Sequence, residues 1–170
     1  MRGNDRIVQQ ALRALGADES DMERSRQETP DVFLPAGRYE NVVALLGRPR
    51  RKETLRAADG RPLTRLRYEL PLWPGLEFFL VGRPGLPFSH DAGFARRPGV
   101  PAIPPKHPDD LRPWAHLRDE VFEAFGPPSQ EGDRWPPYEE YKFQVRTPDG
   151  RTREFWATFS WHLLQRVEWA

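Results

Sequence analysis

The sequence contains no cysteine, and this absence removes several classes of chemistry from consideration. A chain without thiols forms no disulfide framework, binds no zinc through cysteine and has no thiol nucleophile. It also lacks an apolar run long enough for a membrane span or for the core of a signal peptide, so we expect a cytoplasmic protein. The net charge is only +1, which argues against a uniformly basic, nucleic-acid-coated surface.

Signatures of catalysis are missing as well. The sequence has no GxxxxGK[ST] or GxGxxG loop for phosphate, no GxSxG nucleophile turn and no HExxH metal motif. His90 and His107 stand near aspartates in a proline-rich stretch, but a metal centre needs three or four converging ligands. We therefore expect no enzyme activity, no cofactor and no metal site, and a hydrolase using His90 or His107 is the remaining alternative.

Aromatic residues and prolines are what the sequence has in quantity. Its 170 residues include 6 Trp, 10 Phe, 4 Tyr and 19 Pro. Each aromatic side chain buries a large area, so a chain of this length can form a core although only 38% of it is hydrophobic.

Glycine, proline and the spacing of apolar residues divide the chain into four segments. Residues 1–31 predict a helix and a flexible linker, because apolar side chains recur at helical spacing only as far as Leu15. Residues 32–82 and 114–170 each predict a short helix followed by an antiparallel hairpin. Residues 83–113 between them are rich in proline and predict an irregular connection.

The two helix–hairpin segments correspond to each other. Each predicted helix ends at a glycine, Gly47 or Gly126, with a proline two residues later, and such a glycine favours positive φ. A strand around Tyr68 corresponds to one around Phe143, and each is followed by a turn and an aromatic strand. We therefore predict an α+β fold with two tandem repeats, whose strands form one continuous or pseudo-symmetric sheet with the helices on one face.

A short helix ending in a Leu-Gly-x-Pro turn, followed by an antiparallel hairpin with an aromatic face, resembles known modules. It is similar to the unit of the SmpA/OmlA (BamE) lipoprotein domain and to the tandem unit of the secreted beta-lactamase inhibitory proteins. The resemblance implies such a fold and protein binding by an exposed sheet face, although the chain has no signal peptide, lipobox cysteine or disulfide. The residues that carry it are Val42 to Pro49 with Tyr68 to Val81, and Val121 to Pro128 with Tyr138 to Trp169.

The aromatic strand near the C-terminus suggests where a partner binds. Alternation places Phe155 and Phe159 on one side, which is the core if this strand is half-buried, and Trp156 on the other. Trp, Tyr and Arg dominate interface hot spots, whereas burial in a core is the commoner fate of an aromatic residue. We predict a non-catalytic protein-binding module, an inhibitor or immunity-type protein, with Trp73 and Trp156 substantially exposed. Its candidate binding residues are Trp73, Trp156, Arg65, Arg67 and Arg146.

Basic side chains concentrated between residues 48 and 67 support an alternative function. Only Glu53 and Asp59 oppose them, so this stretch is suited to phosphate contacts, with Trp73 near enough in sequence to stack on a base. The same charges also suit a solvated loop or an acidic protein partner. The alternative is a nucleic-acid-binding accessory protein that uses Arg48, Arg50, Arg51, Lys52 and Arg56.

Overall fold

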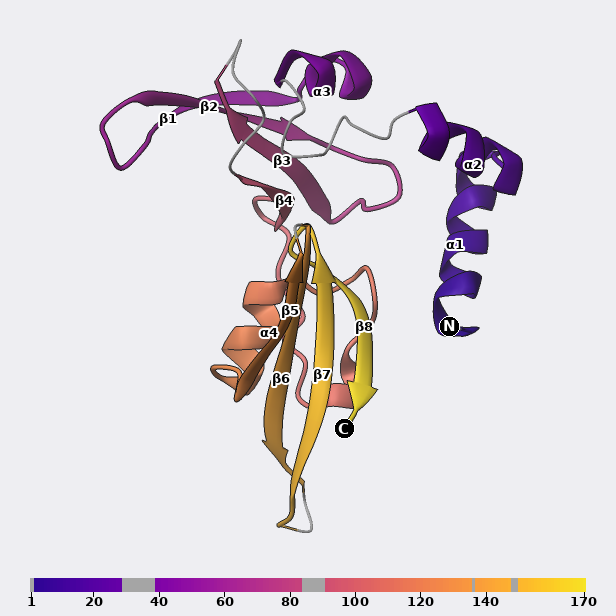
Figure 1. The fold of residues 1–170 in the computed structure, drawn as a ribbon, viewed down its shortest axis with the longest axis vertical. Helices are drawn as coiled ribbons and strands as arrows, with labels where there is room; N and C mark the ends of the chain where they lie inside the picture. Colours follow the sequence, from indigo (N-terminus) through magenta and orange to yellow (C-terminus); the bar gives the residue numbers. More distant parts are fainter. Residues whose placement is uncertain (1, 29–38, 84–90, 136, 148–149) are drawn as a thin grey trace. The chain divides into compact units, whose positions relative to one another are not determined.

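The computed structural model describes residues 2–28, 39–83, 91–135, 137–147 and 150–170. The chain is an α+β protein with helices and antiparallel sheets (Figure 1). The helical elements are α1 (Arg2–Leu15), α2 (Glu19–Glu28), α3 (Tyr39–Leu46), the 3-10 helix η1 (Pro108–Asp110) and α4 (Arg118–Phe125). The strands are β1 (Arg51–Arg56), β2 (Pro62–Tyr68), β3 (Leu76–Gly82), β4 (Asp91–Arg96), β5 (Gln130–Trp135), β6 (Tyr138–Arg146), β7 (Thr152–Ser160) and β8 (Leu163–Trp169).

The strands form two four-stranded sheets, in the orders β1-β2-β3-β4 and β5-β6-β7-β8. The prediction of one continuous sheet is therefore wrong. The chain also divides into two compact units, the first comprising Met1–Pro74 and Phe78–Ala92 and the second Gly75–Glu77 and Gly93–Ala170. Each sheet follows a short helix in the sequence, α3 or α4, and the strands of each sheet are paired in chain order.

Both predicted glycine caps are confirmed. Gly47 follows α3 with φ of 76°, and Gly126 follows α4 with φ of 80°. The amide of Gly47 donates to the Val43 carbonyl at 2.9 Å, and that of Gly126 donates to the Phe122 carbonyl at 2.8 Å. A side chain in this left-handed region is strained, so glycine ends both helices in the same way.

Two segments that were expected to lack regular structure contain some. Within the predicted linker, α2 forms without an apolar stripe, because Asp18 accepts the Asp21 amide at 2.9 Å and so caps the helix. Arg24 pairs with Asp21 one turn along, and acidic side chains in the first turn suit the helix dipole. Within the predicted irregular connection of 83–113, β4 and η1 form.

The first unit takes its apolar centre from β3, which is buried along its whole length. In the register of β2 with β3, Leu66 lies opposite Leu80 and Tyr68 opposite Phe78, and all four side chains are buried. The edge strand β1 pairs with β2 and is mostly exposed, which its sequence RKETLR explains, since Leu55 is its one apolar residue.

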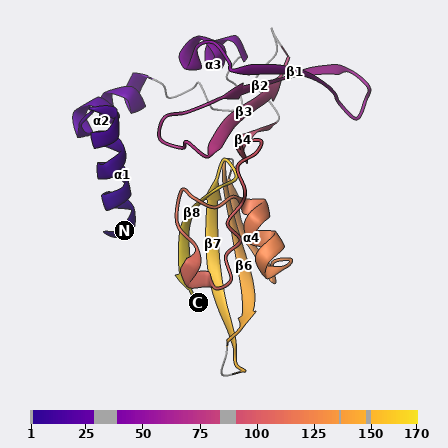
Figure 2. The same cartoon turned by 180° about the vertical axis from the view of Figure 1, so that it is seen from behind.

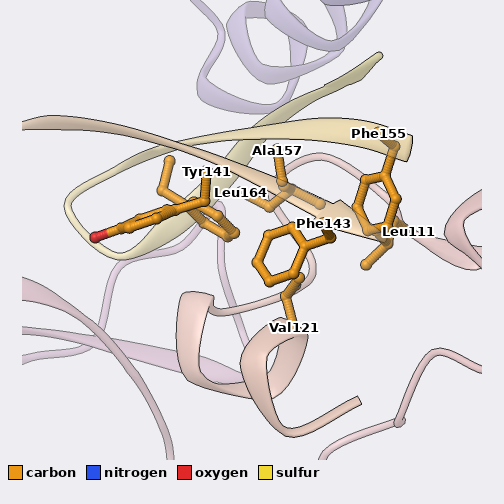
Figure 3. Packing of buried hydrophobic residues seen from close by; sticks show 8 residues of the cluster. Leu111, Val121, Tyr141, Phe143, Phe155, Ala157 and Leu164 are labelled. Atoms are coloured by element: carbon orange, nitrogen blue, oxygen red, sulfur yellow. The ribbon is translucent and has the colours of Figure 1, made fainter. Parts of the chain in front are cut away.

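The second unit has a core of aromatic side chains between α4 and the sheet (Figure 3), and Figure 2 shows α4 alongside that sheet. Phe143 of β6 stacks on Phe155 of β7 with ring centroids 5.3 Å apart, and both are fully buried. Val121 points from α4 toward Phe143 and is also fully buried. Large rings in such contacts compensate for the low apolar content of the chain.

Candidate functional site

One side of the second sheet, which we call the outer face, brings aromatic and charged residues together. Tyr141 and Phe143 point into the core, so the residues that alternate with them on β6 point the other way. The register then places Lys142 opposite Trp156, and Trp156 opposite Glu168. The outer face comprises Trp135, Tyr138, Glu140, Lys142, Gln144, Arg146, Glu154, Trp156, Thr158, Arg166 and Glu168.

Trp156 lies on this face as alternation predicts, but it is half-buried rather than substantially exposed. The Lys142 ammonium lies 5.7 Å from the centroid of its ring. Strand β5 has a register shift between Glu131 and Arg134, and its backbone approaches the indole there. A Cβ placed on Gly132 would lie 3.0 Å from Trp156 Cζ3, so the glycine permits this approach.

Paired charges surround the indole on the outer face. Glu154 accepts hydrogen bonds from Lys142 and from Gln144, and these bonds lower the pKa of its carboxyl. Glu140 accepts a hydrogen bond from the Thr158 hydroxyl at 3.3 Å and lies 3.9 Å from Arg166. The face therefore offers charges of both signs, so it does not favour a partner of one charge.

The most exposed aromatic side chains of the outer face lie at one end of it. Trp135 and Tyr138 are directly opposite each other on β5 and β6, and they are 78% and 53% exposed. Neither residue was among the predicted binding residues, although the sequence Trp-Pro-Pro-Tyr contains a turn signal between two aromatics. Their exposure could not be read from the sequence, because the bulge in β5 decides which way Trp135 points.

The adjoining hairpin tip, between β7 and β8, has an unusual backbone. Trp161 and His162 both have positive φ, 52° and 64°, in a two-residue turn where glycine or asparagine is normal. Three backbone hydrogen bonds hold it: Trp161 donates to the Pro137 carbonyl, Phe94 donates to the Trp161 carbonyl, and Arg118 donates to the His162 carbonyl. The tip is therefore fixed to the loop that carries Trp135 and Tyr138.

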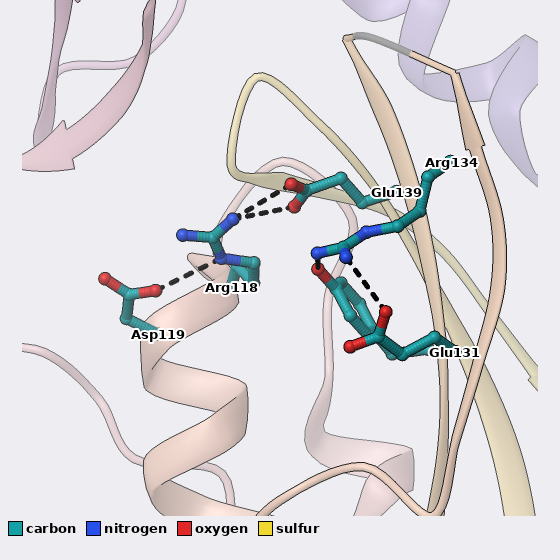
Figure 4. A network of polar contacts seen from close by, with 6 residues as sticks. Arg118, Asp119, Glu131, Arg134 and Glu139 are labelled. Atoms are coloured by element: carbon teal, nitrogen blue, oxygen red, sulfur yellow. Dashed lines mark hydrogen bonds and ion pairs between the residues drawn. The ribbon is translucent and has the colours of Figure 1, made fainter. Parts of the chain in front are cut away.

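A polar network positions the strands that carry these aromatics (Figure 4). Arg118 at the start of α4 donates through one nitrogen to both carboxylate oxygens of Glu139, at 3.0 and 2.8 Å. Arg134 of β5 donates to the Tyr141 hydroxyl at 2.8 Å and to Glu131 at 2.9 Å. The first contact ties α4 to β6 and the second ties β5 to β6, so we assign this network a supporting role.

The five predicted binding residues are divided between the two units. Trp156 and Arg146 lie on the outer face of the second sheet. Arg65 and Arg67 lie on β2 of the first sheet, where Arg65 stands over the Phe79 ring at 5.4 Å and Arg67 bonds to Glu53 at 3.1 Å. Trp73 is half-buried in the connection between β2 and β3.

Carboxylates accompany part of the basic stretch. Arg50 lies 3.7 Å from Glu69 and Arg51 lies 3.0 Å from Glu53. Burial raises the pKa of Glu53, but the hydrogen bond and charge of Arg67 outweigh it, so the pKa stays below its ordinary value. The other three predicted phosphate-contacting residues, Arg48, Lys52 and Arg56, are exposed.

Neither the described residues nor comparison with other proteins points to a known chemistry. In the described part of the chain, no group of three or more His, Asp or Glu side chains is arranged to hold a metal ion. Among the same residues, no helix combines the length and the apolar character that a membrane span requires. His90 lies outside the described residues, and His107 caps η1 by accepting the Asp109 amide at 3.3 Å. No family model, curated protein or solved structure matches this chain.

Proposed function

We propose that this chain is a non-catalytic protein-binding module of the inhibitor or immunity type, working in the cytoplasm. The outer face of the second sheet is its binding surface. The observation that carries the proposal is the pair Trp135 and Tyr138, which lie opposite each other and are both exposed. Tryptophan and tyrosine are the residues most often found at the centre of protein interfaces.

The surroundings of the pair support the same use. Half-buried Trp156 extends the aromatic surface along the face. Arg166, opposite Thr158, lies between Trp156 and the pair, and Arg146 lies beyond Trp156. Charges of both signs around aromatic residues are typical of the polar rim that surrounds the aromatic centre of a protein interface. The Trp161 amide donates to the Pro137 carbonyl between the two residues of the pair, and we expect this bond to reduce the ordering entropy lost on association.

A tandem duplication fits this proposal. A short helix precedes a four-stranded antiparallel sheet twice in the chain, and equivalent glycines end both helices. The resemblance to BamE-type and beta-lactamase-inhibitory modules, which bind proteins through a sheet face, favours the same mode of action here.

Affinity purification from the native host, with identification of captured proteins by mass spectrometry, supplies the partner for the test. Calorimetry with the purified partner should then give a loss of about 2 kcal/mol in binding free energy, roughly thirtyfold in Kd, for Trp135→Ala. Tyr138→Ala is tested in the same way. Its matched control is Leu15→Ala on α1, because Leu15 is 54% exposed, close to the exposed fraction of Tyr138. Equal affinities for Trp135→Ala, Tyr138→Ala and the control would refute the outer face as the binding surface.

Nucleic-acid binding by the first unit is the second candidate function. The exposed Arg48, Lys52 and Arg56 favour it, while the carboxylates beside Arg50 and Arg51 weaken it. Duplex DNA should bind with a log–log salt slope of about −0.9 for each phosphate neutralised. Replacing Arg50, Arg51 and Lys52 together by Ala should flatten that slope. Absence of any DNA or RNA binding at low salt eliminates this candidate.

A further inference from the structure

The segment from residue 100 to residue 106, Val-Pro-Ala-Ile-Pro-Pro-Lys, has a backbone that its own sequence fixes. Proline locks φ near −65° at Pro101, Pro104 and Pro105. A residue that precedes proline is kept out of the helical region, which constrains Val100 and Ile103 as well. These two restrictions together favour a polyproline II helix with three residues per turn.

The segment is mostly exposed. Pro105 is its buried residue, and its side chain packs on the second unit. Ile103 is 77% exposed although it is a large apolar side chain. The other exposed residues of the segment are Pro101, Ala102, Pro104 and Lys106.

Hydrogen bonds anchor the segment at both ends. Before it, the Val100 amide donates to the Arg97 carbonyl at 3.0 Å, closing a turn at Gly99. After it, the amides of Lys106 and His107 both donate to Asp110 Oδ2, at 3.0 and 2.9 Å. These bonds favour the charged form of the Asp110 carboxyl and so lower its pKa. The exposed prolines thus lie between two ends that are held by hydrogen bonds.

We propose that residues 100–106 are a recognition segment for a protein domain that binds polyproline II helices in an aromatic-lined groove. Pro101 and Pro104 have the P-x-x-P spacing that such grooves accept, with exposed Ile103 beside the second proline. Lys106 follows two residues later and is exposed, so the groove that fits this segment has a carboxylate at the corresponding end. Because the prolines restrict the backbone before binding, little conformational entropy is lost on docking.

None of residues 100–106 belongs to the surface assigned to the proposed function. Residues 100–106 precede α4, whereas the outer face consists of β5 to β8. The two surfaces have different chemistry, since one is proline and aliphatic and the other is aromatic and charged. Variants can therefore test them independently.

The test is direct binding of the full chain to a panel of purified SH3, WW and EVH1 domains, measured by calorimetry. We expect micromolar binding to at least one domain of the panel. Pro104→Ala and Lys106→Glu should each weaken that binding about tenfold or more. Pro127→Ala is the matched control, because Pro127 is exposed in the same unit but has no proline three residues before or after it. Trp135→Ala should bind like the unchanged chain.

Two results would overturn the proposal. One is that no domain of the panel binds with Kd below about 1 mM, the weak limit of specific association. The other is binding that neither Pro104→Ala nor Lys106→Glu alters. Lys106→Glu changes an exposed side chain and leaves the core untouched, so it remains informative if Pro104→Ala impairs folding. A loss of binding in Trp135→Ala with normal binding in Lys106→Glu would assign the contact to the outer face instead.

Discussion

Nδ1 of His116 lies 4.0 Å from Oε2 of Glu120, and this buried nitrogen has no hydrogen-bond partner among the described residues. Its other ring nitrogen lies 3.3 Å from the Asp110 carbonyl. Arg96 donates hydrogen bonds to both oxygens of the Glu120 carboxylate, each at 2.8 Å. Burial lowers the pKa of His116 and outweighs the hydrogen bond to the Asp110 carbonyl and the charge of Glu120, which raise it. The charges of Arg96 and Arg112 lower it further.

The buried histidine predicts a loss of stability in mild acid. A folded-state pKa below the ordinary value of about 6.5 means that the unfolded chain binds the proton first as pH falls. The free energy of unfolding should therefore decline as pH falls below about 6.5, with up to about 1.4 kcal/mol per pH unit from this group. Urea denaturation between pH 5 and 7.5 measures the slope. His116→Gln should make it shallower, and an unchanged slope would contradict this assignment.

Trp156→Ala should reduce the free energy of unfolding by about 1–2 kcal/mol, less than a core aromatic, because the indole is half-buried on the outer face. The neighbouring Phe155→Ala is the control. Phe155 is fully buried, and its truncation should cost about 3–5 kcal/mol. Chemical denaturation of both variants gives the comparison, and an equal loss would place Trp156 in the core.

Gly93→Ala should destabilise the second unit by about 1–3 kcal/mol, the usual cost of overpacking. A Cβ there would lie 2.7 Å from His162 Nδ1 and 2.9 Å from the Trp161 carbonyl oxygen, which accepts a backbone hydrogen bond and cannot easily move. Gly75→Ala is a suitable control because the added methyl would meet only ordinary contacts at 3.6 and 3.7 Å. Thermal unfolding compares the two variants. If Gly93→Ala is no less stable than Gly75→Ala, the turn at Trp161 and His162 moves to accommodate the methyl group, and the prediction is wrong.

Glu139→Gln should lower the free energy of unfolding by about 1 kcal/mol. The partly buried Arg118 bonds to both carboxylate oxygens of Glu139, and the amide keeps only one acceptor oxygen and no charge. Asp119 also contacts Arg118 but is exposed, so Asp119→Asn should cost about 0.5 kcal/mol or less. Denaturant midpoints at low and high salt measure both losses. A larger effect from Asp119→Asn than from Glu139→Gln would reverse the assigned order of importance.

Local sequence predicted the features that depend on local chemistry. The glycines after α3 and α4 and the side of β7 that carries Trp156 follow from backbone sterics and from strand alternation. Strand β1 was missed because its charged sequence has no apolar alternation, and only its pairing with β2 makes it a strand. Helix α2 was missed because it is held by a cap and by polar contacts one turn apart.

The candidate site was harder to predict because its key features arise from irregular backbone. A bulge in β5 decides which way Trp135 points, and no local pattern encodes that choice. The turn at Trp161 and His162 has none of the glycine or asparagine that usually indicates such a turn. Contacts from Pro137, Phe94 and Arg118, distant in sequence, hold it in place.

The edge position of β1 has a consequence for how copies of this chain behave together. Among the described strands β1 has a neighbour on one side only, and a second molecule can add a strand at such an edge. Three of the six residues of β1, Arg51, Lys52 and Arg56, are basic, so two such edges repel one another as they approach. The basic stretch thereby opposes edge-to-edge aggregation, and this benefit to colloidal stability weakens as added salt screens the repulsion.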